Sequence, residues 1–373
     1  MLIHGIIKVL KQTNFYLEKE IMKITEDKTI QSFIHDWYLA NARDLPWRNS
    51  NDPYTIWVSE IMLQQTRVEA VIDYFHRFMK RLPTVFDLAT IEDDELYKLW
   101  QGLGYYGRAK NLKKAAKMIV EQYGGVIPNT VEDLIKLPGV GSYTAGAIAS
   151  IAYNKQTPAV DGNVMRVISR IYGSKLDITT PAAKQEMTKI VESLLPVNHI
   201  SIFNQALMEL GATICIPNGK PKCESCPVNI SCIAYHNNET DSIPVKSKKK
   251  ERFIQPMVVL LVKLNKGWLL HKRPSEGLLA HLWEFPNLLG TPSTKEIFAH
   301  LVTHHIQVNH IEQVAKANHI FTHIEWHMNM YLVEGELIGE LKKDDVIATQ
   351  IQMKDQYSIP TAFSHCVRII NGY

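Results

Sequence analysis

Apolar residues recur every three or four positions over most of the first 235 residues, which is the spacing of amphipathic helices. The stretch after Pro53, IWVSEIMLQQTRVEAVIDYFHRFMKRL, has this spacing. So does NLKKAAKMIVEQYGG, where paired glycines end the pattern. The pattern predicts a mainly α-helical domain over residues 29–235, built from helices joined by short loops.

The pattern changes after residue 235. The segment HNNETDSIPVKSKKKER, residues 236–252, is polar and ends in a basic run, as solvated linkers do. Beyond it, residues 253–373 begin with β-branched apolar runs on either side of an Asn-Lys-Gly turn, which predicts a hairpin and a mixed α/β domain. Residues 1–28 match neither domain, and we expect an N-terminal extension there.

Composition limits the class of protein. A chain of 373 residues with 46% hydrophobic residues can bury two cores. No apolar run reaches the roughly eighteen residues of a membrane span, and the opening MLIHGIIKVLKQ lacks the features of a secretory signal. We therefore expect a cytoplasmic protein without membrane contact. The net charge of +3 permits a nucleic-acid partner without requiring one.

The stretch LPGVGSYTAG, residues 137–146, predicts a tight turn between two helices. Gly139 and Gly141 let the backbone approach a partner closely, and a second helix from about Ser142 presents its free amides outward. Such a turn suits an anion such as phosphate. A bare Pro-Gly-Val-Gly sequence is more often an ordinary glycine helix end, which is the alternative.

Two carboxylates have contrasting settings. Glu60 has Ile56 and Trp57 among its helical neighbours, an apolar setting that raises a carboxyl pKa and favours the protonated form. Asp161 precedes an apolar-periodic segment from Val164, at the place of an N-cap, where the helix end favours the anion. One protonated and one ionised carboxyl suit the cleavage of a glycosidic bond. A surface glutamate and a plain helix cap are the ordinary alternatives.

The pairing of LPGVGSYTAGAIAS with VDGNVMRV resembles the signature of the endonuclease III superfamily of DNA glycosylases. Lyase members have a lysine where this chain has Tyr143, and tyrosine cannot form a Schiff base. LPWR, SEIMLQQT and QGLGYYGRAKNL extend the resemblance to MutY-type adenine glycosylases, over roughly residues 29–373. The resemblance implies a mainly α-helical helix-hairpin-helix glycosylase domain with an iron–sulfur module, followed by an α/β Nudix-like domain.

The resemblance also implies catalytic roles. Glu60 would protonate adenine and then help to activate water, and Asp161 would stabilise the sugar cation. Asn163 matches a family residue near the same sugar, and Tyr143 stands in place of the lyase lysine.

A second set of residues is implied to bind DNA. Gln65 and Tyr105 would enter the base stack when the target base is flipped out, although Tyr105 suits a core position equally well. Gly139 and Gly141 would contact the DNA backbone. The resemblance assigns four more side chains to the adenine pocket: Arg43, Trp47, Arg48 and Gln205.

Four of the five cysteines lie together in CIPNGKPKCESCPVNISC, as Cys215, Cys223, Cys226 and Cys232. The grouping argues against a secreted disulfide framework, and four thiolates can converge on one metal centre. Structural zinc sites commonly use two C-x2-C pairs and this chain has one, so a [4Fe–4S] cluster is favoured over residues 215–232. The first interval is one residue longer than in the glycosylase pattern, an insertion that a polar loop absorbs.

The C-terminal segments KRPSEGLLAHLWEFPNL and FTHIEWHMNMYLV resemble the Nudix-like domain of MutY proteins. The hydrolase motif G-x5-E-x7-R-E-U-x-E-E-x-G does not follow EFP, so the carboxylates that would hold magnesium are missing. The resemblance implies that residues 253–373 recognise 8-oxoguanine through a turn made of Phe363, Ser364 and His365. An ordinary surface turn is the alternative.

The sequence therefore predicts a monofunctional, monomeric adenine DNA glycosylase with a [4Fe–4S] cluster. Its partner would be double-stranded DNA with adenine opposite 8-oxoguanine, and also opposite guanine. One alternative is an endonuclease III-like glycosylase/lyase for oxidised pyrimidines, which Tyr143 disfavours. Another is a DNA-binding protein without catalysis, and a third, weaker one is a nucleotide pyrophosphatase.

Overall fold

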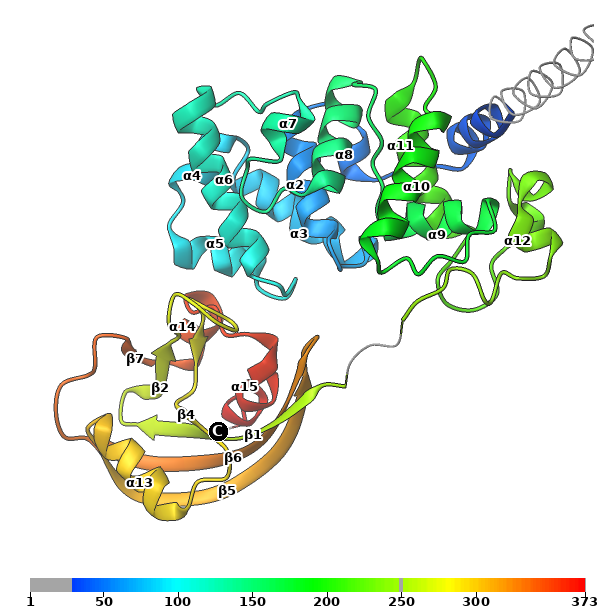
Figure 1. The fold of residues 1–373 in the computed structure, drawn as a ribbon. Coiled ribbons are helices and arrows are strands. Elements are labelled where there is room, and N and C mark those ends of the chain that lie inside the picture. The colour runs from blue at the N-terminus through cyan, green and yellow to red at the C-terminus, as the bar shows by residue number, and fades with distance from the viewer. Residues whose placement is uncertain (1–28, 248–250, 373) are drawn as a thin grey trace, which may run out of the picture. The chain divides into compact units, whose positions relative to one another are not determined.

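The structure, a computed structural model, describes residues 29–247 and 251–372 (Figure 1). These residues divide into two compact units, one made of 29–64 with 118–247 and the other of 65–117 with 251–372. The expected extension over residues 1–28 and part of the expected linker lie outside the described residues. The domain boundaries derived from the sequence stay predictions.

The first unit is helical, as the apolar spacing predicted. Residues 29–41 form a helix, and the further elements are η1 (Pro46–Arg48), α2 (Pro53–Leu63), α7 (Val131–Leu134), α8 (Ser142–Tyr153), α9 (Gly162–Ile171), α10 (Pro181–Leu194), α11 (Ile200–Thr213), η2 (Cys223–Ser225), η3 (Asn229–Ser231) and α12 (Ile233–His236). Helix α8 packs against α2 and α11, and α11 also packs against α9. A core of apolar side chains joins the first helix to α9, α10 and α11.

Local sequence signals explain where several of these helices begin. Pro53 and Pro181 stand in the first turns of α2 and α10, where a missing N–H costs nothing. The side chains of Asp52 and Thr180 cap these two helices by accepting bonds from backbone amides. The short side chains therefore satisfy amide groups that the helices leave unpaired.

The long helical stretch after Pro53 forms two helices instead of one. Helix α2 ends at Leu63 and α3 begins at Val68. Between them Gln65 has φ 58°, in the left-handed region that non-glycine residues seldom occupy. Apolar spacing continues on both sides of the break, so periodicity alone does not reveal it.

The second unit combines helices with a sheet. Its helices are α3 (Val68–Arg81), α4 (Val85–Thr90), α5 (Asp93–Trp100), most of α6 (Gly107–Tyr123), α13 (Thr294–Thr303), α14 (Gln350–Asp355), η4 (Thr361–Phe363) and α15 (Ser364–Ile370). Its strands are β1 (Phe253–Leu264), β2 (Gly267–Lys272), β3 (Trp283–Glu284), β4 (Asn287–Leu289), β5 (Ile306–Ile320), β6 (Ile324–Leu337) and β7 (Asp345–Ala348). Residues 253–372 thus form the α/β part that the sequence predicted.

The sheet is mixed, with the order β3-β2-β1-β6-β5. Strands β1 and β6 run parallel from Phe253↔Ile324 to Lys263↔Glu334, whereas β1 and β2 are antiparallel and pair Leu264 with Gly267. This pairing confirms the predicted hairpin at the Asn-Lys-Gly turn. Two further short strands join outside this order, β4 on β1 and β7 on β2.

Both faces of the sheet are covered, which explains why β1 is apolar at successive positions. Met257 and Val259 face a core that includes residues of α14 and α15. Val258 and Leu260 face the opposite core, which includes α13 (Figure 1). Cys366 of α15 is fully buried in the first core, where a free thiol packs as a small apolar side chain.

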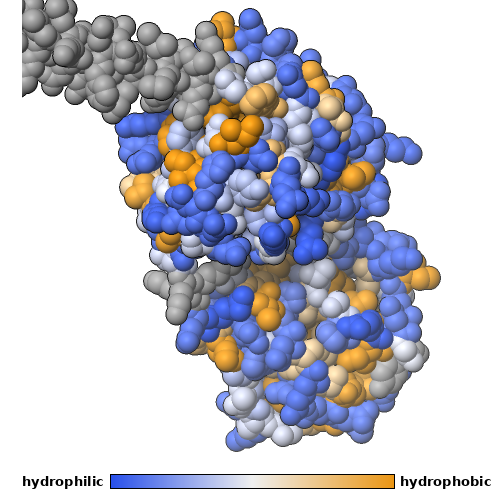
Figure 2. Space-filling view, turned by 90° about the vertical axis from the view of Figure 1, so that its right-hand side faces the viewer, coloured by the Kyte–Doolittle hydropathy of each residue, from blue (hydrophilic) through white to orange (hydrophobic). Residues whose placement is uncertain are grey.

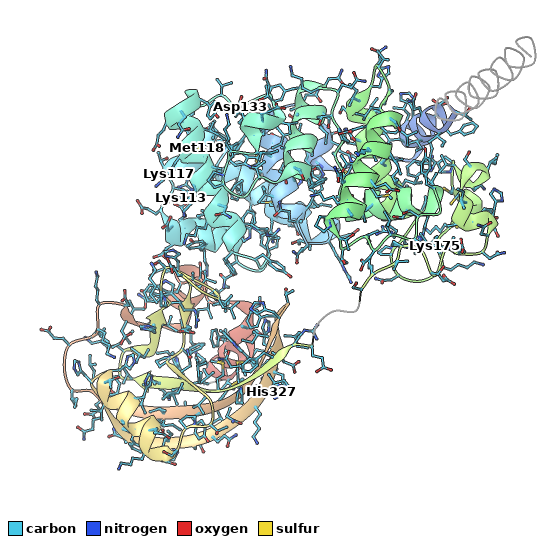
Figure 3. All side chains as sticks on the ribbon, in the orientation of Figure 1. Lys113, Lys117, Met118, Asp133, Lys175 and His327 are labelled. Atoms are coloured by element: carbon cyan, nitrogen blue, oxygen red, sulfur yellow. The ribbon has the colours of Figure 1, made fainter. Side chains whose placement is uncertain are left out.

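The surface mixes apolar and polar side chains. On the face in Figure 2, apolar residues are scattered among hydrophilic ones. Figure 3 shows Lys113 and Lys117 one turn apart on α6, and Lys113 pairs with Asp93. Among the described residues, no helix combines the length and the apolar character that crossing a membrane requires.

Two close backbone approaches fix the helices of the first unit. A Cβ atom added to Gly211 of α11 would lie 2.7 Å from Cβ of Asn163, and one added to Gly146 of α8 would lie 2.2 Å from the carbonyl oxygen of Pro158. Both values are shorter than carbon and oxygen atoms normally permit. Glycine at these positions therefore allows α11 and α8 to lie against the segment that leads into α9.

We expect Gly211→Ala to lower the free energy of unfolding by about 1–3 kcal/mol, because the added methyl group must displace the first turn of α9. Thermal unfolding followed by circular dichroism measures this change. Gly107→Ala, at the start of α6 where a Cβ would meet nothing within 4 Å, is the control and should be neutral. Equal stability of the two variants would contradict the close packing of α11 on α9.

Candidate active site

Glu60 is a buried carboxyl on α2, only 6% exposed. Burial raises its pKa to about 7, and the neighbouring charge of Asp161 adds to this increase. A hydrogen bond from Tyr143 and the positive charge of Arg48 act in the opposite direction. The predicted apolar setting of Glu60 is confirmed, and near neutral pH the group is available in both protonation states.

Tyr143 reaches Glu60 from the second helix of the Pro-Gly-Val-Gly turn. Helix α8 begins at Ser142, and the Tyr143 hydroxyl donates a hydrogen bond to Oε2 of Glu60. The same hydroxyl lies 3.7 Å from Sδ of Met208 on α11. Burial and the two nearby carboxylates raise the pKa of Tyr143 well above its usual value. Tyr143 is therefore a neutral donor to Glu60.

Asp161 caps α9, as predicted. Its Oδ1 accepts from the backbone N–H of Val164 at 2.8 Å, and its Oδ2 accepts from Nδ2 of Asn163 at 2.8 Å. Burial nevertheless raises the pKa of the Asp161 carboxyl, against the lowering effect of these bonds. The helix end alone suggested a readily ionised group, and that expectation left out the cost of burial.

Arg166 joins Asn163 to the loop that carries the first cysteine. Its Nη2 donates to Oδ1 of Asn163 at 2.9 Å and to the carbonyl oxygen of Gly211 at 2.8 Å. Its Nε donates to the carbonyl oxygen of Cys215 at 2.8 Å. The buried guanidinium group thus fixes both the Asn163 amide and the start of the cysteine loop.

The residues assigned to a base pocket also lie in the first unit. Trp47 is buried in η1, with Arg43 just before this element and Arg48 at its end. Gln205 lies on α11 and accepts a 3.3 Å bond from the Tyr38 hydroxyl. Both arginines bind the buried carboxylate of Glu209, which sequence reasoning missed.

The proposed DNA-backbone turn has the glycine geometry that the sequence suggested. Gly139 has φ 79°, a value that favours glycine. Gly141 is the N-cap of α8 and has no side chain to satisfy the first amides of the helix. The first amides of α8 therefore have no side-chain cap.

Gln65 and Tyr105, the residues assigned to the base stack, share an unusual backbone conformation. Gln65 has φ 58° and Tyr105 has φ 47°, and both are exposed. A left-handed conformation costs a non-glycine residue about 1–3 kcal/mol and occurs often at functional sites. Tyr105 is 50% exposed, which removes the alternative of a core aromatic.

The four clustered cysteines line one small cavity together with Arg170 and Tyr235. All four thiols are free of disulfides, and Nη1 of Arg170 donates to Sγ of Cys215 at 3.3 Å. The donor set suits an iron–sulfur cluster because it supplies four thiolates and a positive group beside them. Within the described residues, no group of three or more His, Cys, Asp or Glu side chains stands ready to hold a metal ion.

The three residues assigned to 8-oxoguanine recognition do not share one environment. Phe363 is fully buried and packs on Phe285 and Trp326 in the core of the sheet. Ser364 and His365 are exposed at the start of α15. The aromatic ring of Phe363 thus belongs to the core, and the assignment of the three residues to 8-oxoguanine stays a prediction.

Two buried polar residues escaped sequence reasoning. Glu209 is 1% exposed, and Asn204 is fully buried, with bonds to the backbone of Thr157 and Ala159. Both stand among apolar residues on the buried face of α11. A polar residue on a buried helix face needs a partner, and that rule is the signal that could have found them.

We expect the Glu60 carboxyl to titrate near pH 7, which carbon-13 NMR of labelled glutamate can measure. Tyr143→Phe should move the midpoint to higher pH, because it removes a hydrogen bond to the ionised form. Glu186→Gln, an exposed glutamate on α10, is the control and should leave it unchanged. A midpoint near 4.5 in the parent would contradict the burial of Glu60.

Residues 58–193 match the HhH-GPD superfamily of base excision DNA repair proteins, and residues 257–368 match the NUDIX domain. A solved structure of a thermostable thymine-DNA glycosylase is 32% identical, with a TM-score of 0.53, and covers 58% of this chain and 99% of that chain. The helical glycosylase fold and the Nudix-like fold predicted from the sequence are both confirmed.

Curated relatives match over most of the chain. The adenine DNA glycosylase of Buchnera aphidicola subsp. Acyrthosiphon pisum is 36% identical over 311 residues, which cover 83% of this chain and 88% of the relative. The adenine DNA glycosylase of Homo sapiens is 32% identical over 387 residues, which cover 87% of this chain and 70% of the relative. With this identity over both matched domains, the chain belongs to the adenine DNA glycosylase family of base excision repair proteins.

Proposed function

We propose that the chain removes adenine from double-stranded DNA where adenine stands opposite 8-oxoguanine or guanine, without cleaving the strand. The family membership makes it an adenine-specific DNA N-glycosylase, a hydrolase of N-glycosyl bonds. The observation that carries the proposal is the buried Glu60 carboxyl, with a pKa of about 7, beside the Asp161 carboxylate. The two groups supply an acid and an anion in one site.

The reaction follows from these two groups. Protonated Glu60 donates its proton to N7 of adenine while the bond between C1′ and N9 breaks, and the bonding electrons leave with the base. The sugar then carries positive charge, which ionised Asp161 stabilises. Water adds to C1′ after losing a proton to the Glu60 carboxylate, which restores the acid. Asn163 holds Asp161 through its 2.8 Å amide bond.

Tyr143 supports the monofunctional reaction. A lyase needs an amine that forms an imine with the sugar, and the Tyr143 hydroxyl has no such chemistry. Its hydrogen bond to Glu60 gives it a different task, which is to orient the acid. Sugar chemistry therefore ends with hydrolysis, and the strand remains intact.

The exposed residues support contact with duplex DNA. Helix α8 offers its free amides to a phosphate at Gly139 and Gly141. Gln65 and Tyr105 would enter the base stack and offset the cost of flipping adenine out. Ser364 and His365 would contact the oxidised guanine, while buried Phe363 fixes the start of α15. One copy of the chain carries every residue that this proposal uses.

The four cysteines would hold a [4Fe–4S] cluster. Cys215, Cys223, Cys226 and Cys232 supply the thiolates, and the bound cluster would fix the loops that surround it. The cluster takes no part in the steps at adenine. Arg170 would donate a hydrogen bond to the sulfur of Cys215.

Duplexes that carry adenine opposite 8-oxoguanine, guanine or thymine test the proposed reaction. We expect free adenine from the first two, strand cleavage only after alkali, and a rate that falls as pH rises through about 7, because Glu60 must be protonated. Glu60→Gln and Asp161→Asn should each slow release by roughly 10²–10⁴-fold. Strand cleavage without alkali would contradict the monofunctional reaction, and equal release opposite thymine would contradict the specificity.

Iron and sulfide analysis tests the cofactor. We expect about four iron and four sulfide atoms per chain, with loss of both in Cys226→Ser. Cys366→Ser is the matched control, because Cys366 lies in the core of the sheet, far along the chain from the other four. Stoichiometric zinc without sulfide in the parent would show that the cysteines hold a different metal.

A further inference from the structure

Glu209 is a buried carboxylate that the proposed reaction does not use. It lies on α11, is 1% exposed, and binds two arginines from outside its helix. Arg43 donates to Oε1 through Nε at 2.7 Å and through its backbone N–H at 3.2 Å, and to Oε2 through Nη2 at 2.9 Å. Arg48 donates to Oε2 through Nη2 at 2.6 Å. One carboxylate therefore meets two guanidinium groups.

These bonds fix the short segment that contains Trp47. Nη1 of Arg48 donates to the carbonyl oxygen of Arg43 at 3.0 Å, which closes the segment on itself. The Arg48 guanidinium also lies over the ring of Tyr38, 5.4 Å from its centroid, and the Tyr38 hydroxyl donates to Gln205. Every side chain assigned to the base pocket is thus held directly or indirectly at Glu209.

The positive charge of Arg48 also acts on the pKa of Glu60. The groups that act on the pKa of Glu60 come from three elements: neutral Tyr143 of α8 and the charged groups Asp161, at the start of α9, and Arg48 of η1. Arg48 favours the ionised form of Glu60, which is the wrong form for an acid. Glu209 stays ionised because Arg43 and Arg48 lower its pKa against the effect of burial. Its single negative charge offsets part of the positive charge of the two arginines.

We propose that Glu209 is a positioning residue for the adenine pocket. It holds Arg43 and Arg48 beside Trp47 and offsets the positive charge of Arg48, so that Glu60 keeps its proton. This inference rests on the proposed function, in which Glu60 is the acid. It goes further by naming the residue that sets the geometry and the electrostatic balance of the base pocket. Glu209 itself touches neither the base nor the sugar in this account.

A purely structural ion pair would behave differently. Loss of a buried partner then lowers stability and activity together and leaves the pH dependence unchanged. Charge balance, in contrast, predicts a change of pH dependence. Glu209→Gln keeps the size of the side chain and removes its charge, so Arg48 would act on Glu60 without compensation and lower the pKa of that acid.

The first experiment measures the Glu60 titration by carbon-13 NMR in the full chain without DNA. We expect Glu209→Gln to move the midpoint down by about half to one pH unit, and Glu209→Asp, which keeps the charge, to move it less. The double variant Arg48→Gln with Glu209→Gln removes the cation as well and should restore the midpoint. An unchanged midpoint in folded Glu209→Gln would overturn the charge balance. If Glu209→Gln fails to fold, a double variant whose midpoint differs clearly from that of the parent would overturn it.

The second experiment measures adenine release under single-turnover conditions from pH 5.5 to 9, with saturating duplex that carries adenine opposite 8-oxoguanine. In Glu209→Gln the fall in rate should begin at lower pH, with about two- to sixfold slower release at neutral pH, as the expected shift of the Glu60 midpoint requires. Binding to a duplex with an abasic analogue, which has no adenine to recognise, should change less than twofold. Glu186→Gln changes an exposed residue of α10 and is the control, so its rate and pH profile should match those of the parent.

The two experiments separate the two claims. If the parent releases no adenine from any duplex, the proposed function fails, while the NMR midpoint still tests the balance between Glu209 and Arg48. If the parent releases adenine and the pH profile of Glu209→Gln matches it, Glu209 is a structural ion pair and the inference fails. Equal weakening of abasic-duplex binding would likewise show a general structural loss.

Discussion

The site depends on the removal of one carboxyl group from water. Glu60 lies where α2 packs against α8, and this contact both raises the pKa of the acid and brings Tyr143 within hydrogen-bond distance. A glutamate on a solvated helix face would be ionised at neutral pH and could not donate a proton. The packing of α2 against α8 therefore sets the pKa of this carboxyl group.

At Asp161, burial and hydrogen-bond donors also act on the carboxyl pKa in opposite directions. Burial raises its pKa, but the amide of Val164, the side chain of Asn163 and the charge of Arg166 favour the anion. The two carboxyl groups thus experience similar burial and differ in their hydrogen-bond donors. Glu60 accepts a bond from the neutral hydroxyl of Tyr143, whereas Asp161 accepts bonds from the backbone of a helix end and from Asn163, which favour its ionised form.

Sequence reasoning reached the features that depend on local pattern. The burial of Glu60, the cap at Asp161 and the hairpin before Gly267 follow from neighbouring residues, and the structure confirms them. It missed features that depend on distant partners. The break at Gln65 lies inside continuous apolar spacing, and Phe363 gives no sign in the sequence of which way its ring points. The partners of Glu209 lie more than 160 positions away along the chain.

Helix α11 connects parts of the site that are separate in the sequence. Gln205 binds Tyr38, and Glu209 binds Arg43 and Arg48. Met208 lies beside Tyr143, and Gly211 touches the start of α9 at Asn163. A small rotation of this one helix would displace its partners Arg43 and Arg48 together with the first turn of α9. Within the family, a substitution on the buried face of α11 should therefore occur together with compensating substitutions in both segments that this helix contacts.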